Sequence, residues 1–460
     1  MNIRSFFQIL PPRIPCATLA STPVPLPLPE RVTLLWPDRS PADLAVRAGD
    51  SVKTGQNLAR ADKDFLVSTV TGGIEEISVF DGPQGCPYAA VAIQVAPKDD
   101  FDPSLKAVQD VESASPVSLR NALFEAGFSS LSSLCDNPAL WPNVDTLVVS
   151  ALDADPLGIA DQQALRDNPE GIENGIAILQ KATEASQIVM AVPEGLADSA
   201  GRLPQGAARM VRMPALYPNG LPEILAAKCA GGVLLERKGA DITGDTLVIG
   251  AEEAAATTCI LDGKPLMERT VSISSGNAPE PVNVRVRIGA PVSDILAHLD
   301  IQLQPKGKLI LNGILRGYAC FSDEQPVAAD TGSIHVQAPA DVFFYQQTAC
   351  TNCGKCNAIC PVDLEVNLLG RYSEYGVFDK CRPLGAENCI ECGLCAYVCP
   401  ARRPLVQFIS HAKHAIRTQT MSQISMEEAL ACNACGPTCP ALRLFETGPP
   451  EGAVPDKNQE

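Results

Sequence analysis

Two cysteine runs with the same spacing dominate the chemistry that this sequence could perform. One extends from Cys350 to Pro361 and the other from Cys389 to Pro400, and each has the pattern C-x2-C-x2-C-x3-C-P. This spacing places three thiolates around one iron–sulfur cube, while the fourth cysteine ligates the neighbouring cube. Gly354 and Gly393 lie where each loop must bend sharply, which a residue without Cβ allows. The pattern therefore predicts two [4Fe–4S] clusters and one-electron chemistry.

The exchange of the fourth cysteine between the two runs assigns the ligands of each cluster. The first cluster is assigned to Cys350, Cys353, Cys356 and Cys399. The second cluster is assigned to Cys389, Cys392, Cys395 and Cys360. Structural zinc is an alternative, but zinc usually needs only four ligands in two pairs, so two matched runs of four cysteines favour iron–sulfur clusters.

A shorter cysteine motif lies closer to the C-terminus. It consists of Cys432, Cys435, Cys439 and Pro440, with the spacing C-x2-C-x3-C-P. If Cys381, which lies between the two long runs, is an outside fourth ligand, this motif is compatible with a third cluster. A zinc site with the same four ligands and a set of unligated thiols both remain open.

The composition excludes several other functions. The chain has 460 residues, with 36 Lys and Arg against 53 Asp and Glu, and a formal net charge of −17. This charge argues against nucleic acid as a partner and against direct binding to anionic lipid. No apolar run reaches the ~18 residues of a membrane span. Six cysteines are scattered singly before the long runs, which predicts no disulfide framework and fits a reducing cytoplasm.

Several structured parts precede the cysteine runs and must position them. Residues 31–97 read as short strands, with a hairpin signal at residues 48–56 and a further strand opening at Thr71. Residues 117–255 alternate between strands and helices, which predicts a parallel, Rossmann-like α/β layer. Residues 256–345 read as strands with one helix.

The expected elements can be given by residue range. In the α/β layer we expect helices at 119–128, 172–183 and 221–228, and strands at 146–152, 187–192 and 246–249. Further on we expect strands at 271–276, 282–288 and 308–311, a helix at 291–299, and a helix from about Pro404 with Leu405, Phe408, Ile409, Ala412 and Ile416 on one face. The expected parts are a lead-in at 1–30, domains at 31–97, 117–255, 256–345 and 346–418, a C-terminal helix with the extra cysteine motif at 419–446, and a disordered tail at 447–460.

The order of these parts resembles the C subunit of the Rnf electron-transport complex over roughly residues 25–415. The most specific match runs from Cys389 to Phe408, where the family has a CIECGxCxxVCPxxxPLVQ pattern. The resemblance implies a multidomain protein of α/β and α+β class. Its parts would be a barrel-sandwich (lipoyl-like) module, a Rossmann-like domain of the complex I flavin-subunit type, an SLBB β-grasp domain and a bacterial-type ferredoxin domain with two [4Fe–4S] clusters.

The chain departs from that family at the flavin loop. The family has a glycine-rich GxGGAGFP-type stretch, which lets the backbone approach the flavin phosphate. At the matching place, residues 123–129, only Ala-Gly-Phe is kept, and the bulk of Leu123 and Phe124 and the charge of Glu125 oppose a phosphate. In the family, an acidic stretch follows the next strand. In this chain residues 150–157 take its place, and we expect them to form the polar end of a loop. Here the chain resembles the A subunit of the sodium-translocating NADH:quinone reductase (Nqr), so we expect this fold without bound FMN.

The resemblance implies an iron–sulfur electron-transfer subunit of an ion-translocating, Rnf- or Nqr-like oxidoreductase complex. It would be peripheral, on the cytoplasmic face of the inner membrane, between a soluble donor (ferredoxin or NADH) and membrane-bound redox partners. Such a role needs no acid–base catalytic residue, because the clusters change oxidation state by one electron. A soluble adaptor similar to the cobalamin reductases is the alternative function, and a scaffold whose cysteines carry no iron is a third.

Overall fold

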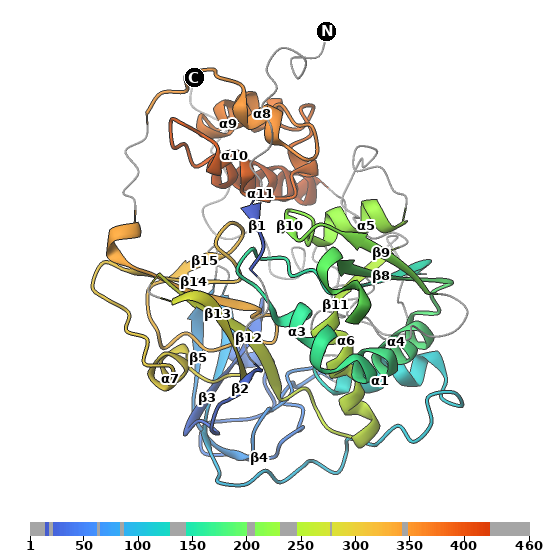
Figure 1. The fold of residues 1–460 in the computed structure, drawn as a ribbon. Helices are drawn as coiled ribbons and strands as arrows, with labels where there is room; N and C mark the ends of the chain where they lie inside the picture. The colour runs from blue at the N-terminus through green and yellow to red at the C-terminus, as the bar shows by residue number, and fades with distance from the viewer. Residues whose placement is uncertain are drawn as a thin grey trace. The chain divides into compact units, whose positions relative to one another are not determined.

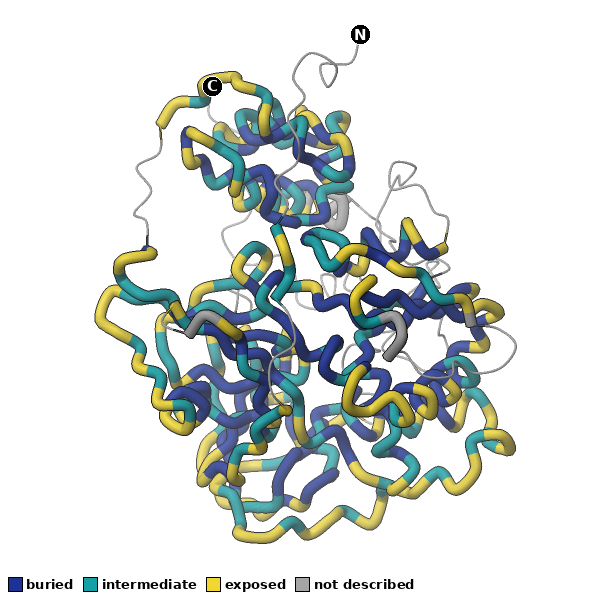
Figure 2. Tube along the Cα trace, in the orientation of Figure 1, coloured by how far each residue is buried: buried dark blue, intermediate teal, exposed yellow. Residues whose placement is uncertain are grey.

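Three main β-sheets and a small helical part make up the described residues of the chain in the computed structural model (Figure 1). The structure describes residues 14–17, 22–61, 65–82, 87–128, 144–199, 208–230, 246–276, 278–342 and 348–423. These residues fall into two compact units, one holding the three sheets up to residue 342 and one holding residues 348–423. The buried residues follow the central strands of the sheets, and the exposed residues lie mainly along the loops (Figure 2).

The first sheet is antiparallel and has four strands. Its order is β3 (Arg31–Pro37), β6 (Pro87–Val95), β5 (Gly72–Asp81) and β4 (Ser51–Val52). Alternate residues of β3 are buried, namely Val32, Leu34 and Trp36, as expected for a strand with one face on a core. β5 opens one residue after Thr71, which confirms the predicted strand there.

The chain folds back on itself around residues 48–56, where the sequence predicts a hairpin. Leu44 forms an antiparallel bridge with Ala59, and the amide of Ala45 donates to the carbonyl of Leu58 at 2.9 Å. Gly49 and Gly55, on either side of β4, have φ angles of 94° and 91°. The two residues of β4 lie opposite Gly72 and Gly73 of β5, a pairing that the sequence did not indicate.

The second sheet is parallel throughout, which confirms the predicted α/β layer. Its order is β11 (Thr246–Gly250), β7 (Thr146–Ser150), β8 (Gln187–Pro193) and β9 (Ala208–Met213). Three of these strands are apolar and were predicted. The fourth, β9, was missed, because Arg209 and Arg212 interrupt its apolar run.

Helices cover both faces of the parallel sheet. They are α1 (Pro116–Glu125), α3 (Ala160–Asp167), α4 (Pro169–Thr183), α5 (Pro222–Ala230) and α6 (Ala251–Ala256). α5 packs Leu225 and Cys229 against one face, where they meet Val148 and Val189. α4 and α6 pack against each other and contact β7. A Cβ on Gly175 of α4 would overlap a backbone carbonyl of α6, so this close approach requires glycine.

The third sheet has six strands in mixed orientation. Its order is β15 (Tyr318–Cys320), β14 (Lys308–Leu311), β16 (Ser333–Gln337), β12 (Glu268–Ser275), β13 (Ala278–Arg287) and β2 (Val24–Pro25). The helix α7 (Val292–His298) packs on its core. The strands at β12, β13 and β14 and the helix were predicted. β2 shows that the N-terminal lead-in contributes a strand, which pairs in parallel with β13.

Side chains and backbone join the third sheet to both of its neighbours. The amide of Thr33 in the first sheet donates to the carbonyl of Gly289 at 2.8 Å. The guanidinium of Arg316 makes two bonds of 3.1 Å to the carboxylate of Glu223 on α5. The three sheets therefore form one unit, and the finer domain boundaries drawn from the sequence remain predictions.

The unit of residues 348–423 is built from short helices around the two cysteine runs. They are α8 (Lys355–Ile359), α9 (Val366–Glu374), α10 (Leu394–Tyr397) and α11 (Leu405–Gln423). Leu405, Ile409, Ala412 and Ile416 of α11 are buried and Phe408 is half-buried, which confirms the predicted apolar face. Within the described residues, no helix is both long enough and apolar enough to cross a membrane. The predicted tail at 447–460 lies outside the described residues.

Short elements complete the described fold. They are the strands β1 (Ile14–Pro15) and β10 (Leu216–Tyr217) and the 3-10 helices Pro41–Asp43, Glu194–Ser199, Thr257–Asp262, Pro339–Asp341, Phe378–Lys380 and Ala386–Asn388.

Candidate metal centre

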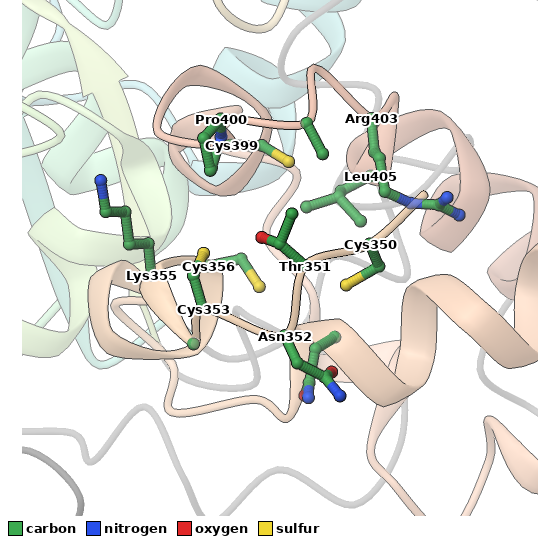
Figure 3. Close-up of a pocket in the computed structure, with 13 residues that line it drawn as sticks. Cys350, Thr351, Asn352, Cys353, Lys355, Cys356, Cys399, Pro400, Arg403 and Leu405 are labelled. Carbon is green, nitrogen blue, oxygen red and sulfur yellow. The ribbon is translucent and has the colours of Figure 1, made fainter. Parts of the chain in front are cut away.

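Four cysteines of the first predicted cluster line one pocket. They are Cys350, Cys353, Cys356 and Cys399, and Figure 3 shows their side chains around a shared space. The last of these comes from the other run, so the structure brings together residues almost fifty positions apart in the chain. We refer to these four residues as the first set.

The two runs repeat the same backbone turns. Asn352 and Gly354 of the first run have φ angles of 55° and 72°, and Glu391 and Gly393 of the second have φ angles of 53° and 78°. Left-handed residues on either side of the second cysteine turn the chain sharply at that point. The second left-handed position is glycine in both runs, whereas the first carries a side chain.

The second set, made of Cys360, Cys389, Cys392 and Cys395, is also gathered in one place. Burial raises the pKa of the Cys395 thiol, and the neighbouring thiols of the other three members raise it further. Three members are buried, with exposed fractions of 7–8%, and Cys389 is half-buried. Each set thus offers four thiols, which is the donor chemistry that an iron–sulfur cluster requires.

The electrostatic surroundings of the thiols differ from one cysteine to the next. The pKa of Cys350 is lowered, chiefly by the backbone amide of Asn352 and further by Arg371 and Arg403. Burial raises the pKa of Cys356 and of Cys389 to about 11. Buried thiols of this kind stay protonated until a metal displaces the proton, so metal binding would release protons here. Among the described residues, no three His, Cys, Asp or Glu side chains are grouped so as to hold a single metal ion.

Charged side chains that the sequence analysis did not single out hold the two runs in place. Arg371 of α9 donates to Oδ1 of Asn352 at 2.5 Å, which ties the first run to that helix. Lys413 of α11 donates to the carbonyl of Cys389 at 2.8 Å and to the carboxylate of Glu391 at 2.6 Å. Arg371 and Lys413 lie outside both cysteine runs, so no sequence pattern indicated these contacts.

Only one member of the predicted third site lies within the described residues. Cys381 is fully buried, with its Sγ 3.5 Å from Oγ of Ser373 and 3.7 Å from the carbonyl oxygen of Val377. The other three members, Cys432, Cys435 and Cys439, lie outside the described residues. The structure therefore leaves the third site a prediction.

At the place of the family's flavin loop, the bulky apolar side chains point into the core, whereas Glu125 is exposed. Leu123 and Phe124 of α1 are buried, and the ring of Phe124 makes an edge contact with Phe65 at 6.4 Å between centroids. The carbonyl of Ala126 accepts a 2.7 Å bond from the amide of Leu266. These residues fill space and link the α/β layer to the start of the third sheet.

The carboxyl edge of the parallel sheet is the usual place for a ligand in this type of fold. Here the N-terminal residues 14–17 lie across it. β1 pairs with β10, the amide of Cys16 donates to Ala215 at 3.0 Å, and the amide of Ala17 donates to Pro156 at 2.7 Å. The chain itself therefore occupies part of this edge.

Two aspartates at this edge have partners within the chain. Asp153 accepts bonds from the backbone and side chain of Gln162 and from the amide of Asp161, and burial raises its pKa to about 6. Asp155 accepts a 2.7 Å bond from Ser333 of the third sheet, and burial raises its pKa as well. Residues 150–157, which we expected to form the polar end of a loop, thus form an internal junction between the second and third sheets.

Comparisons with known proteins agree with the cysteine pattern. Residues 343–400 match the family of 4Fe–4S dicluster domains. The C subunit of the ion-translocating oxidoreductase complex of Methanosarcina acetivorans is 28% identical, over 83% of this chain and 91% of its own length. The protein of the same name from Rhodobacter capsulatus is 26% identical, over 85% of this chain and 78% of its own length. This chain is a homologue of the Rnf C subunit.

A third relative of this kind has a more specific name. It is the C subunit of the Na(+)-translocating ferredoxin:NAD(+) oxidoreductase complex of Acetobacterium woodii, 24% identical over 83% of this chain and 89% of its own length. Among solved structures, the NAD+-reducing [NiFe]-hydrogenase in its H2-reduced state matches with a TM-score of 0.41 and 12% sequence identity. The match covers 71% of this chain and 70% of the hydrogenase chain.

Proposed function

We propose that this Rnf homologue is an iron–sulfur electron-transfer subunit of a membrane-associated, ion-translocating oxidoreductase complex. The observation that carries the proposal is the gathering of eight cysteines into two sets of four, inside the stretch that matches 4Fe–4S dicluster domains. The names of the relatives, which cover more than four fifths of the chain, support the same role.

The ligand assignment is part of this proposal. One [4Fe–4S] cluster is held by the first set and one by the second set. When bound, each cluster takes up and releases a single electron, at a potential that hydrogen bonds and burial adjust. The chain's own contribution is to position the thiols, through Arg371 on the first run and Lys413 on the second, and to limit the access of water to the second set.

Partners and location follow from the relatives by analogy. The proposed partners are the membrane subunits of an Rnf- or Nqr-like complex and a soluble donor, either ferredoxin or NADH-linked, because one relative is named for ferredoxin and NAD+. The proposed location is peripheral, on the cytoplasmic face of the inner membrane. Purification of the protein with membrane subunits would support this assignment, whereas stable purification with a soluble cofactor-bearing enzyme would favour an adaptor role instead.

We infer that the protein carries no FMN of its own. Two observations support the inference. Bulky side chains at Leu123 and Phe124 fill the place of the family's flavin loop, and residues 14–17 lie across the carboxyl edge of the parallel sheet. An FMN phosphate would need open backbone amides where this chain has packed side chains.

Anaerobic analysis of iron, sulfide, zinc and flavin in the intact protein tests these proposals together. Two clusters give about eight iron atoms and eight sulfides per chain, and a third cluster on Cys381, Cys432, Cys435 and Cys439 raises the number to about twelve. One equivalent of zinc would instead assign that motif to a zinc site. The proposal fails if the reduced protein gives no iron signal in electron paramagnetic resonance, and stoichiometric flavin would overturn the inference about FMN.

A further inference from the structure

The two sets of cysteines differ in burial. In the first set one cysteine is buried, whereas Cys353 is exposed and Cys350 and Cys399 are half-buried. In the second set three of the four cysteines are buried and Cys389 is half-buried. A cube with four thiolate ligands is an anion, and its reduction adds one more negative charge, which burial disfavours. Burial therefore favours reduction at the first set over reduction at the second.

The positive charge beside the first set is only partly balanced. Arg371 of α9 donates to Oδ1 of Asn352, which is a neutral amide in the first run. Among the ion pairs of the described residues, none includes Arg371. Arg403 lines the pocket of the first set and is paired with Glu374. Two guanidinium groups beside the first set are thus accompanied by one carboxylate.

Beside the second set, the positive charge is balanced within the run itself. Lys413 of α11 donates to the carbonyl of Cys389 at 2.8 Å and to the carboxylate of Glu391 at 2.6 Å. The negative charge of Glu391 therefore offsets that of the ammonium group. The imbalance of charge beside the two sets favours reduction at the first set, which is the same direction as the difference in burial.

The thiols of the two sets respond to these surroundings in opposite ways. The pKa of the Cys350 thiol is lowered, chiefly by the backbone amide of Asn352 and further by Arg371 and Arg403. The pKa of the Cys389 thiol is raised, chiefly by burial. Groups that stabilise a thiolate also stabilise the additional negative charge of a reduced cluster, because both are anions in the same field.

We propose that Arg371, together with the lower burial of the first set, makes the first set the stronger electron acceptor of the two, so that a chain reduced by one electron holds this electron there. This proposal rests on the proposed electron-transfer function. The step is the transfer of one electron from a reduced cluster on the second set to an oxidised cluster on the first. No proton moves, and no bond is formed or broken.

A redox titration of the anaerobically purified protein, followed by electron paramagnetic resonance, tests the order of the two potentials. Cys392→Ala should keep only the cluster of the first set, and Cys353→Ala only that of the second. The cluster in Cys392→Ala should accept an electron with at least a tenfold preference over the cluster in Cys353→Ala, which is about 59 mV for one electron. Equal potentials, or the reverse order, would overturn the proposal.

Substitution of Arg371 tests the role of its charge. At a fixed potential, Arg371→Gln in the Cys392→Ala background should lower the ratio of reduced to oxidised cluster about tenfold. Arg371→Lys keeps the charge and should change this ratio by less than about threefold. The matched control is Arg417→Gln, which removes an exposed charge of α11 outside the pocket of the first set and should also change the ratio by less than about threefold.

The comparison of these variants decides between charge and structure. If Arg371→Gln has no larger effect than Arg417→Gln, the role of Arg371 is overturned. An equal effect of Arg371→Lys and Arg371→Gln would show that Arg371 acts through the shape of the loop, and it would also overturn the assignment to charge. In the chain that keeps all its cysteines, Arg371→Gln should lower the upper of the two potentials, which tests the same claim without loss of a ligand.

Iron content, measured on every variant, separates this proposal from the function on which it rests. If the wild-type protein holds no reducible iron, the proposed function fails. If the wild-type protein holds two reducible clusters whose potentials do not follow this order, the electron-transfer function stands and the proposal about the first set is overturned.

Discussion

The cysteine loops and the carboxyl edge of the parallel sheet are two regions where a fold of this kind can hold a cofactor, and they use their polar groups in opposite ways. In the loops, the thiols of the first set line one pocket, and the other thiols of the second set lie near Cys395. At the sheet edge, Asp153 and Asp155 are bonded to Gln162 and Ser333, and residues 14–17 lie across the edge. Polar groups that are already bonded within the chain are not available to a ligand, and this difference is the basis of the proposal that no FMN binds at the sheet edge.

The largest expected effect is on the cysteine loops. Cys392→Ala should remove one cluster, which is about four iron atoms per chain or half of the iron in the two assigned sites. Cys353→Ala should remove the other cluster and leave that of the second set. Cys259→Ala, at a half-buried cysteine of the other unit, is the control and should leave iron unchanged. Full iron content in Cys392→Ala, measured by mass spectrometry, would refute the ligand assignment.

The sheet edge should respond with lost stability and no change in cofactor content. Asp153→Ala leaves the amide of Asp161 without its acceptor in a buried place and removes the 3.1 Å bond from the side chain of Gln162. We expect the free energy of unfolding to fall by about 1–3 kcal/mol in urea denaturation. The exposed Asp262→Ala is the control and should change stability by less than about 0.5 kcal/mol. If Asp153→Ala or the wild-type protein took up FMN, followed by flavin fluorescence, the contrast between the two regions would break down.

Substitution of Glu253 should have a smaller effect on stability, and this effect should depend on pH. Burial raises the pKa of Glu253, at the start of α6, to about 7. Because the folded state holds this proton more tightly than the unfolded state, stability falls as the pH rises from about 5 to about 7 and stays lower above that range. Glu253→Gln should therefore raise the stability at pH ~8 by about 1–2 kcal/mol and change little at pH ~5. The exposed Glu173→Gln is the control, and equal gains at both pH values would contradict the assignment.

The smallest effect concerns the junction between two sheets. Ser333→Ala removes the 2.7 Å bond to Asp155 and should lower the free energy of unfolding by about 1 kcal/mol. Loss of the hydroxyl also removes a donor that holds the Asp155 pKa down, so the cost should be larger at neutral pH than at low pH. No change at neutral pH, measured by thermal unfolding, would show that the junction is held by packing alone.

The elements that a local sequence pattern marks were predicted correctly. β7, β8 and β11 are short apolar runs and were located correctly, as was the buried face of α11. β9 was missed because its burial comes from pairing with β8, which its two arginines conceal. The signal at residues 48–56 located a real fold-back, between Leu44 and Ala59, but not the pairing of β4 with β5, since turn residues mark where a chain bends and not which strand it meets.

The sequence by itself determined the number, spacing and pairing pattern of the thiols, because the ligands of a cube come from tight loops whose geometry depends on a few neighbouring residues. Only the tertiary structure decided that three members of the second set are buried while Cys353 of the first is exposed. It also decided that residues 14–17 cover the sheet edge, where Cys16 meets Ala215. Burial and occupancy depend on contacts between residues far apart in the chain, and no local pattern records them.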